Sequence, residues 1–222
     1  MLPPSQETRS EDRLTPRGTK AFSLMELLII VALISTLTSL SVVSMRGNSG
    51  ALNLQTSGVQ CANLLESARG TAILRKVPVA VALMPAEANM PAALTVLAYQ
   101  PDSSRWVQIS NWEKLSYGVV MDPSFEPASN SALPGNSPVI SPALPSLTRD
   151  GSTYAPGKSD GYAYLVFMPS GALYQDNSNP GMLRLAAGTV EEGTVRLTNG
   201  TANYFNLFVN PSTGRVKIAR PE

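Results

Sequence analysis

One carboxylate, Glu26, lies in an otherwise apolar run and is the side chain whose chemistry most needs an explanation. From Phe22 to Val43 there are 22 residues, and Glu26 is the only ionisable residue among them. A charge inside hydrocarbon costs about 2.5–3.5 kcal/mol on insertion scales. We therefore expect Glu26 to need a cationic partner, and the chemistry that it offers is ion pairing.

A second group with chemical potential is the loop Asp176-Asn177-Ser178-Asn179-Pro180-Gly181. It alternates oxygen donors of the kind that bind calcium, but it lacks the distal bidentate acid of an EF-hand loop. We expect ordinary turn chemistry at this position. The sequence predicts no metal site and no other cofactor.

The composition excludes several classes of catalytic and metal site. The chain has no histidine, which removes the usual general base near neutral pH and every Ser-His or Cys-His nucleophile. Cys61 is the single cysteine, so an internal disulfide or a site with several thiolates cannot form. We expect Cys61 to be a buried core residue, with an intermolecular or reactive role as the alternative. We find no active site and expect a protein that is not an enzyme.

The sequence predicts three parts: a leader that precedes Glu26, a helix that contains it, and a head that follows. Residues 1–21 form a polar leader whose last two charges, Arg17 and Lys20, are positive, which places the leader in the cytoplasm. Residues 22–76 are expected to be a long helical region, and the apolar run from 22 to 43 would reach roughly 33 Å, about the thickness of a hydrocarbon core. Residues 77–222 are expected to be an exported β-rich head.

The start of the helix resembles the cleavage and methylation motif of type IV pilins and pseudopilins. The matching residues are Lys20-Ala21-Phe22-Ser23-Leu24-Met25-Glu26-Leu27-Leu28-Ile29-Ile30-Val31-Ala32-Leu33-Ile34. The resemblance implies that a prepilin peptidase cuts between Ala21 and Phe22 and methylates the new amino terminus at Phe22. It also implies that Glu26 pairs with the terminal amine of a neighbouring subunit in a filament. The extreme tip subunit of such filaments commonly lacks this glutamate, so Glu26 implies a subunit with a neighbour above it.

Two positions depart from the pattern of that family. Ala21 stands where most members have glycine, and Val43 stands where many major pilins have a proline that kinks the helix. Gly47-Asn48-Ser49-Gly50 instead supplies a break or bend after the apolar run, because glycine and asparagine weaken helix continuity. The sequence therefore predicts a segmented helix.

The second half of the helix is predicted to be amphipathic. Apolar or small residues recur at steps of four and three, which is a helical period, at Leu54, Gly58, Cys61, Leu65, Ala68 and Ala72. Polar residues fall largely off this stripe: Gln55, Gln60, Asn63, Glu66 and Arg69. We expect the stripe to pack on a sheet, which gives an α+β fold with a long helix on an antiparallel β-sheet.

The head shows the short alternating runs that are typical of strands. We predict strands at 77–84, 92–99, 105–110, 117–121, 162–168, 182–187, 203–209 and 215–219. The turn Asn210-Pro211-Ser212-Thr213-Gly214 predicts a hairpin between the last two. Residues 122–161 hold seven prolines, so we expect a surface excursion there, either a mobile insertion or a surface for a partner.

Three segments narrow the resemblance. Residues 64–73, followed by Val77-Pro78-Val79-Ala80-Val81, resemble H-type minor pseudopilins and the related FimT-like minor pilins, and residues 112–119 and 167–171 resemble recurring segments of that group. A cassette family of prepilin-like proteins known from Verrucomicrobia (Verru_Chthon) has a similar layout. The resemblance implies a non-catalytic minor subunit of a type II secretion or type IV pilus-like filament.

The same resemblance raises a second function. Gly214-Arg215-Val216-Lys217, with Arg220 nearby, is similar to the basic segment through which some FimT-like pilins bind DNA. Strand alternation puts Arg215 and Lys217 on one face, where they would suit backbone phosphates. Basic residues on an edge strand also protect against strand-to-strand aggregation, so both interpretations stay open. The net charge of +1 provides no global field for nucleic acid.

The expected partners follow from these resemblances. They are the prepilin peptidase, other pilin or pseudopilin subunits through the helix, and the inner membrane before assembly, with the head in the periplasm. An exported domain that is anchored in the membrane and does not assemble is a further alternative.

Overall fold

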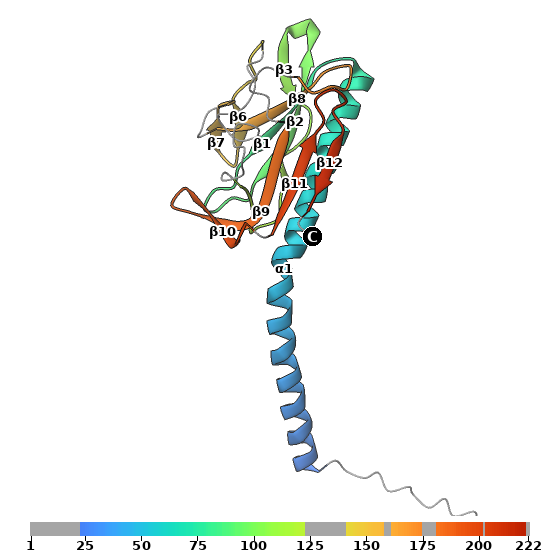
Figure 1. The fold of residues 1–222 in the computed structure, drawn as a ribbon. Coiled ribbons are helices and arrows are strands. Elements are labelled where there is room, and N and C mark those ends of the chain that lie inside the picture. The colour runs from blue at the N-terminus through green and yellow to red at the C-terminus, as the bar shows by residue number, and fades with distance from the viewer. Residues whose placement is uncertain (1–22, 123–140, 158–160, 175–180, 202, 221–222) are drawn as a thin grey trace, which may run out of the picture. The chain divides into compact units, whose positions relative to one another are not determined.

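The structure is a computed structural model that describes residues 23–122, 141–157, 161–174, 181–201 and 203–220 (Figure 1). Side chains are described for these residues apart from 37–49 and 199–201. The chain divides into two compact units, Met1–Met45 and Arg46–Glu222, and each is considered by itself.

One helix, α1 (Leu24–Arg75), contributes to both units. It begins after Ser23, whose carbonyl oxygen accepts hydrogen bonds from the backbone N–H of Glu26 at 3.0 Å and of Leu27 at 3.1 Å. It ends before Lys76, which has a left-handed φ of 55° and is followed two residues later by Pro78.

The predicted break in the helix is wrong, because the backbone of residues 47–50 is helical. Glycine in a helix interior costs about 1 kcal/mol relative to alanine, but it keeps its backbone hydrogen bonds, whereas proline removes one. The glycines at 47 and 50 therefore weaken α1 locally without ending it.

Among the described residues of Arg46–Glu222, the strands form two five-stranded sheets and a two-stranded one, with antiparallel pairing between the strands. The first sheet has the order β3 (Arg105–Gln108), β2 (Ala93–Gln100), β1 (Val79–Met84) and β8 (Ala163–Phe167), with β4 (Glu113–Lys114) also paired to β2. The second has the order β10 (Thr194–Thr201), β9 (Met182–Glu191), β11 (Tyr204–Val209) and β12 (Val216–Ala219), with β5 (Val119–Met121) also paired to β9. The small sheet joins β6 (Leu147–Arg149) to β7 (Ser152–Tyr154).

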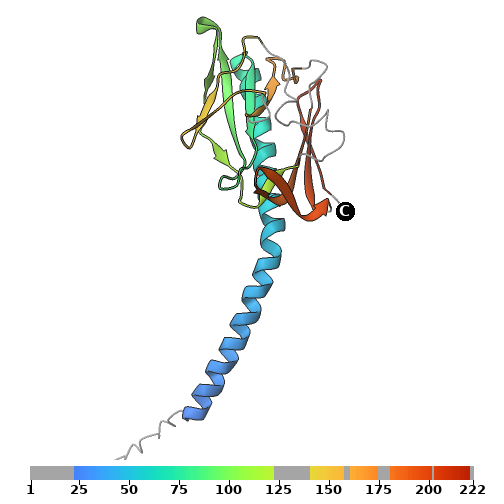
Figure 2. The ribbon, with the colours of Figure 1, turned by 90° about the vertical axis from the view of Figure 1, so that its left-hand side faces the viewer.

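The main core lies where the head part of α1 packs against both large sheets, which stand on either side of it in Figure 2. The whole predicted stripe of α1 is buried, from Leu54 to Ala72. It meets the inner faces of the first sheet, through residues such as Val81 and Leu165, and of the second, through Phe205 and Leu207. The predicted α+β architecture and the amphipathic helix are therefore confirmed.

The first sheet is buried on its other face as well. A second cluster forms there from β1, β2 and β8 together with Leu144, Leu147 and Tyr154. These three residues belong to the region that was expected to be a surface excursion, so that expectation is wrong for their side chains, which are buried. The apolar side chains of this region cover the sheet, which explains why β1 and β8 are buried at every position.

The eight predicted strand segments are confirmed, but the prediction of one sheet is wrong. The structure adds β4, β6, β7 and β10, which the sequence did not predict. Two of the unpredicted hairpins have two-residue turns in which both residues have positive φ, Asp150-Gly151 between β6 and β7 and Glu192-Gly193 between β9 and β10. Such turns match the twist of the flanking strands.

Gly58 and Gly70 provide a test of the packing between α1 and the second sheet. A Cβ atom at Gly58 would lie 2.5 Å from carbons of the Phe205 ring, which is 1% exposed, whereas a Cβ at Gly70 would have nothing within 4 Å. We expect Gly58→Ala to lower the free energy of unfolding by about 1–3 kcal/mol, because the ring has no room to move. Gly70→Ala is the control and should raise it by up to about 1 kcal/mol. Urea denaturation measures both, and equal stability of the two variants would contradict the packing.

Candidate functional site

The first turns of α1 present apolar side chains in every direction. Within Met1–Met45, all the described side chains from residue 23 to residue 36 are exposed. Leu24 is 83% exposed and Leu27 and Leu28 are 59% exposed. A helix that is apolar all round is one that works in a buried environment, in a membrane or among other helices.

Glu26 is the one charged side chain in this described segment, and two hydroxyl groups of the segment bond to the helix backbone. The Ser35 hydroxyl donates to the Val31 carbonyl at 2.7 Å and the Thr36 hydroxyl donates to the Leu33 carbonyl at 2.9 Å, so both are turned onto the helix backbone. Glu26 lies in the first turn, where the unpaired N–H groups and the dipole of a helix favour a negative charge. The segment therefore combines an apolar surface with one carboxylate at its amino-terminal end.

Several predicted sites lie outside the described residues. They are Ala21 and Phe22 at the predicted cleavage point and residues 176–180 of the loop that was weighed as a calcium site. In the part of the chain that the structure describes, three or more metal-binding side chains of the His, Cys, Asp and Glu types do not gather anywhere. Within the same described residues, none of the helices has the length and apolarity needed to cross a membrane.

In the head, α1 holds the C-terminal hairpin through two polar side chains. Glu66 Oε1 accepts a hydrogen bond from the Val216 backbone N–H at 2.7 Å, and Arg69 Nε donates to the Thr213 carbonyl at 2.6 Å. Glu66 and Arg69 also lie 3.6 Å apart as an ion pair. Both residues lie off the predicted stripe and were assigned no role from the sequence. Their spacing of three predicts the ion pair between them but not the contact with the hairpin.

The hairpin between β11 and β12 is confirmed. Asn210 Oδ1 accepts hydrogen bonds from the backbone N–H groups of Ser212 and Thr213, both at 3.0 Å. Gly214 has a φ of 63°, and a Cβ there would collide with the carbonyl oxygen of Gly171. Only glycine fits this close approach, which seats the turn against the loop that follows β8.

The three basic residues of the hairpin do not form one cluster. Arg215 and Lys217 are exposed, and alternation along the strand puts them on the same side. Arg220 lies on the other side, where its guanidinium carbon is 4.8 Å from the centroid of the Phe205 ring. The structure therefore brings together two of the three candidate DNA contacts and uses the third for packing.

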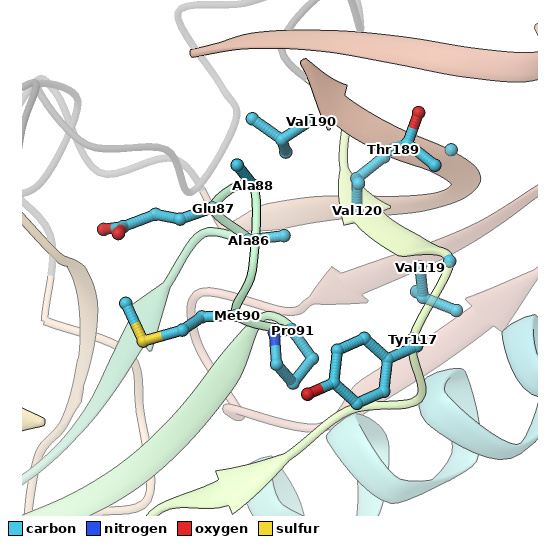
Figure 3. Close-up of a pocket in the computed structure, with 12 residues that line it drawn as sticks. Ala86, Glu87, Ala88, Met90, Pro91, Tyr117, Val119, Val120, Thr189 and Val190 are labelled. Atoms are coloured by element: carbon cyan, nitrogen blue, oxygen red, sulfur yellow. The ribbon is translucent and has the colours of Figure 1, made fainter. Parts of the chain in front are cut away.

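A small hollow of about 90 Å³ lies between the loop after β1 and strands β5 and β9 (Figure 3). Most of its lining is aliphatic, with Glu87, Tyr117 and Thr189 as the polar side chains among those labelled. The Glu87 carboxylate points away from the Tyr117 hydroxyl. Burial raises the pKa of Tyr154, and a hydrogen bond to Glu87 raises it further, so Glu87 also contacts Tyr154 of the second cluster.

Cys61 is fully buried in the main core, as the sequence predicted. Burial raises the pKa of the Cys61 thiol from 9.0 to about 12, and the negative charge of Glu113 adds to the effect. A thiol in this state is a poor nucleophile, because the thiolate is the reactive form.

The Cys61 thiol makes stability depend on alkaline pH. Because the folded state has the higher pKa, the neutral thiol contributes its full stability below pH 9.0 and loses it as the pH rises toward about 12. We expect the free energy of unfolding of the wild type to fall more steeply between pH 8.5 and roughly 10.5 than that of Cys61→Ala. The native thiol should also react much more slowly with iodoacetamide at pH 8.5 than the thiol in urea. Parallel pH profiles together with equal alkylation rates would contradict the burial of Cys61.

A known protein family matches most of the head. The family described as "Type II transport protein GspH" matches residues 60–212. Among solved structures, the minor pseudopilin EpsH from the type 2 secretion system of Vibrio cholerae is similar, with 12% sequence identity and a TM-score of 0.39. That match covers 76% of this chain and 97% of EpsH. A search of curated proteins gave no match.

Proposed function

The chain belongs to the family of the type II transport protein GspH, and from this premise we propose that it works as a minor pseudopilin. In this role it is a non-catalytic subunit of a type II secretion filament and contributes a helix and a β-rich head. The observation that carries the proposal is the exposed apolar surface of residues 24–34, which holds Glu26 as its one charge.

We propose that Glu26 selects and registers the next subunit. A prepilin peptidase would cut between Ala21 and Phe22, which creates a new cationic amine four residues before Glu26. Inside a bundle of such helices, the amine of one subunit and the carboxylate of another replace two isolated buried charges with a pair. Loss of one partner of a buried pair costs about 3–5 kcal/mol, so assembly should depend strongly on Glu26.

Before assembly, we propose that residues 22–43 hold the chain in the inner membrane. The support is their sequence, in which Glu26 is the one ionisable residue among 22. The positive residues Arg17 and Lys20 keep the leader in the cytoplasm and send residues 77–222 to the periplasm. Transfer of the helix from lipid to the filament would then give Glu26 its partner.

Replacement of Glu26 tests the pairing. In cells with an active prepilin peptidase, we expect Glu26→Gln to be cleaved at Phe22 like the wild type, because its fold and its cleavage point are unchanged. Its incorporation into filaments, measured by cross-linking to other subunits, should fall at least about 10-fold, since a lost buried pair costs more than 1.4 kcal/mol. Mass spectrometry of the amino terminus measures the cleavage.

Met25→Gln is the matched control, because it places the same amide on the neighbouring position of the same exposed turn. It should assemble far better than Glu26→Gln. Normal assembly of processed Glu26→Gln would contradict the pairing role, and an uncut terminus at Met1 would contradict the pseudopilin function itself.

DNA contact by the C-terminal hairpin is a second candidate function. The observation that favours it is the exposure of Arg215 and Lys217 on one side of the hairpin. Two phosphate contacts give a weak and salt-dependent affinity, with a slope of log K against log salt of about −1.8. The alternative role of the two residues is to keep the edge of β12 from pairing with another strand.

A salt titration separates these roles. If the pair binds duplex DNA, the slope of about −1.8 should vanish in the double variant Arg215→Ala, Lys217→Ala. Arg220→Ala is the control and should keep the slope, because Arg220 packs on Phe205. Fluorescence anisotropy of a labelled duplex measures the affinity. Absence of any salt-dependent affinity in the wild type would end the DNA hypothesis and leave the protective role.

A further inference from the structure

The outer face of the first sheet holds residues 141–148, here called the strap, through a regular row of donors. Trp106 Nε1 donates to the Pro142 carbonyl at 2.9 Å, and the Tyr162 hydroxyl donates to the Pro145 carbonyl at 2.6 Å. Trp112 Nε1 donates to the Thr148 carbonyl at 3.0 Å. The accepting carbonyls are three residues apart, which is the repeat of a polyproline II helix.

Burial along the strap follows the same repeat of three. Leu144 and Leu147 are each 4% exposed and enter the second cluster, whereas Pro142 and Pro145 are exposed. Burial raises the pKa of Tyr162, so its hydroxyl keeps the proton that it donates. The sheet therefore holds a proline-containing segment by aromatic donors to every third carbonyl, which is the chemistry by which aromatic grooves recognise proline-rich peptides.

At the start of the strap, the aromatic row continues into a hollow of about 180 Å³. Tyr99 and Trp106 lie with ring centroids 5.6 Å apart and with their planes tilted by 59°. The lining is mostly apolar and consists of Pro78, Tyr99, Trp106, Ser141, Pro142, Met168 and Tyr174. Trp106 thus belongs both to the hollow and to the row that holds the strap.

We propose that this hollow is a docking site for an extended, proline-containing segment of a partner protein. The occupant is inferred from continuity: the hollow opens beside Pro142, shares Trp106 with the strap, and offers further aromatic faces of the same kind. A proline ring fills an apolar hollow and loses little conformational entropy on binding, because its backbone is already restricted. Met168 adds an adaptable apolar side chain to the lining. The site lies in the head and is independent of the role of Glu26.

Binding of an oligoproline decamer to the full chain in detergent tests the proposal, with a Gly-Ser decamer as the control peptide. Isothermal titration calorimetry should show saturable binding of the oligoproline alone. Tyr99→Ala should weaken it at least about 10-fold, and Met168→Gln, which makes the lining polar without removing an aromatic ring, should weaken it as well. Trp112→Phe is the control variant, because Trp112 holds the far end of the strap and does not line the hollow. Its affinity should stay within about 2-fold of the wild type.

Three results would overturn the proposal. The first is the absence of saturable binding to the wild type, and the second is equal binding of the Gly-Ser decamer. The third is unchanged affinity in folded Tyr99→Ala and Met168→Gln, with folding checked by urea denaturation. Binding that appears only after residues 123–140 are replaced by a Gly-Ser linker would assign the hollow to the chain itself and would overturn the partner as well.

Discussion

The fold of the head depends on one helix that packs against two sheets at once. In the described residues the two large sheets share no strand pairing, and the main core joins them through the buried stripe of α1. Small residues on the stripe, Gly58, Cys61, Ala68 and Ala72, let the sheets approach the helix closely. The Phe205 ring occupies the space that a side chain at position 58 would need. A side chain at position 58 would have to displace this ring, because the core is closely packed.

The same helix also completes the second sheet at its edge. The strand β12 has no further strand beside it in the described residues, and an edge of this kind exposes unpaired backbone groups. Glu66 takes the hydrogen bond of the Val216 N–H, and Arg69 takes the carbonyl of Thr213 in the turn before it. The charges of both side chains are partly neutralised by each other. Glu66 and Arg69, which border the buried stripe of α1, thus make hydrogen bonds to the backbone near the start of β12, where no strand lies beside it in the described residues.

Much of the head could be predicted from the sequence because its patterns are local. The stripe from Leu54 to Ala72 has a helical period, and the strands at 204–209 and 216–219 flank an obvious turn, so both were found. The strand β10 was missed because Thr194–Thr201 is polar and contains glycine and asparagine. The hairpins at Asp150-Gly151 and Glu192-Gly193 had a signal, an acidic residue followed by glycine, but in each case the flanking residues did not alternate clearly.

Contacts between residues that lie far apart in the sequence could not be predicted from patterns along the chain. Nothing in the spacing of Glu66 and Arg69 says that they meet a hairpin about 150 residues later, and nothing in the spacing of Arg220 says that it covers Phe205. The division into two sheets depends on which strands pair, and the burial of β1 on both faces depends on a proline-rich region that returns to cover it. The family was suggested by the residues around Glu26, whereas the match that establishes it lies at 60–212 in the head.

The two parts of α1 differ in whether the chain itself buries their apolar side chains. In the head part, apolar residues are confined to one stripe, and the chain buries that stripe itself. In the described first turns, the large apolar side chains are spread around the helix and are exposed, from Leu24 to Ile34. Such a surface is stable only when something outside the chain covers it, either lipid or other helices. Lipid can cover the apolar residues but leaves Glu26 without a partner, whereas a helix that brings a cation satisfies both. Under the proposed function, the single carboxylate would turn a general affinity for apolar surroundings into a preference for a helix that brings a cation.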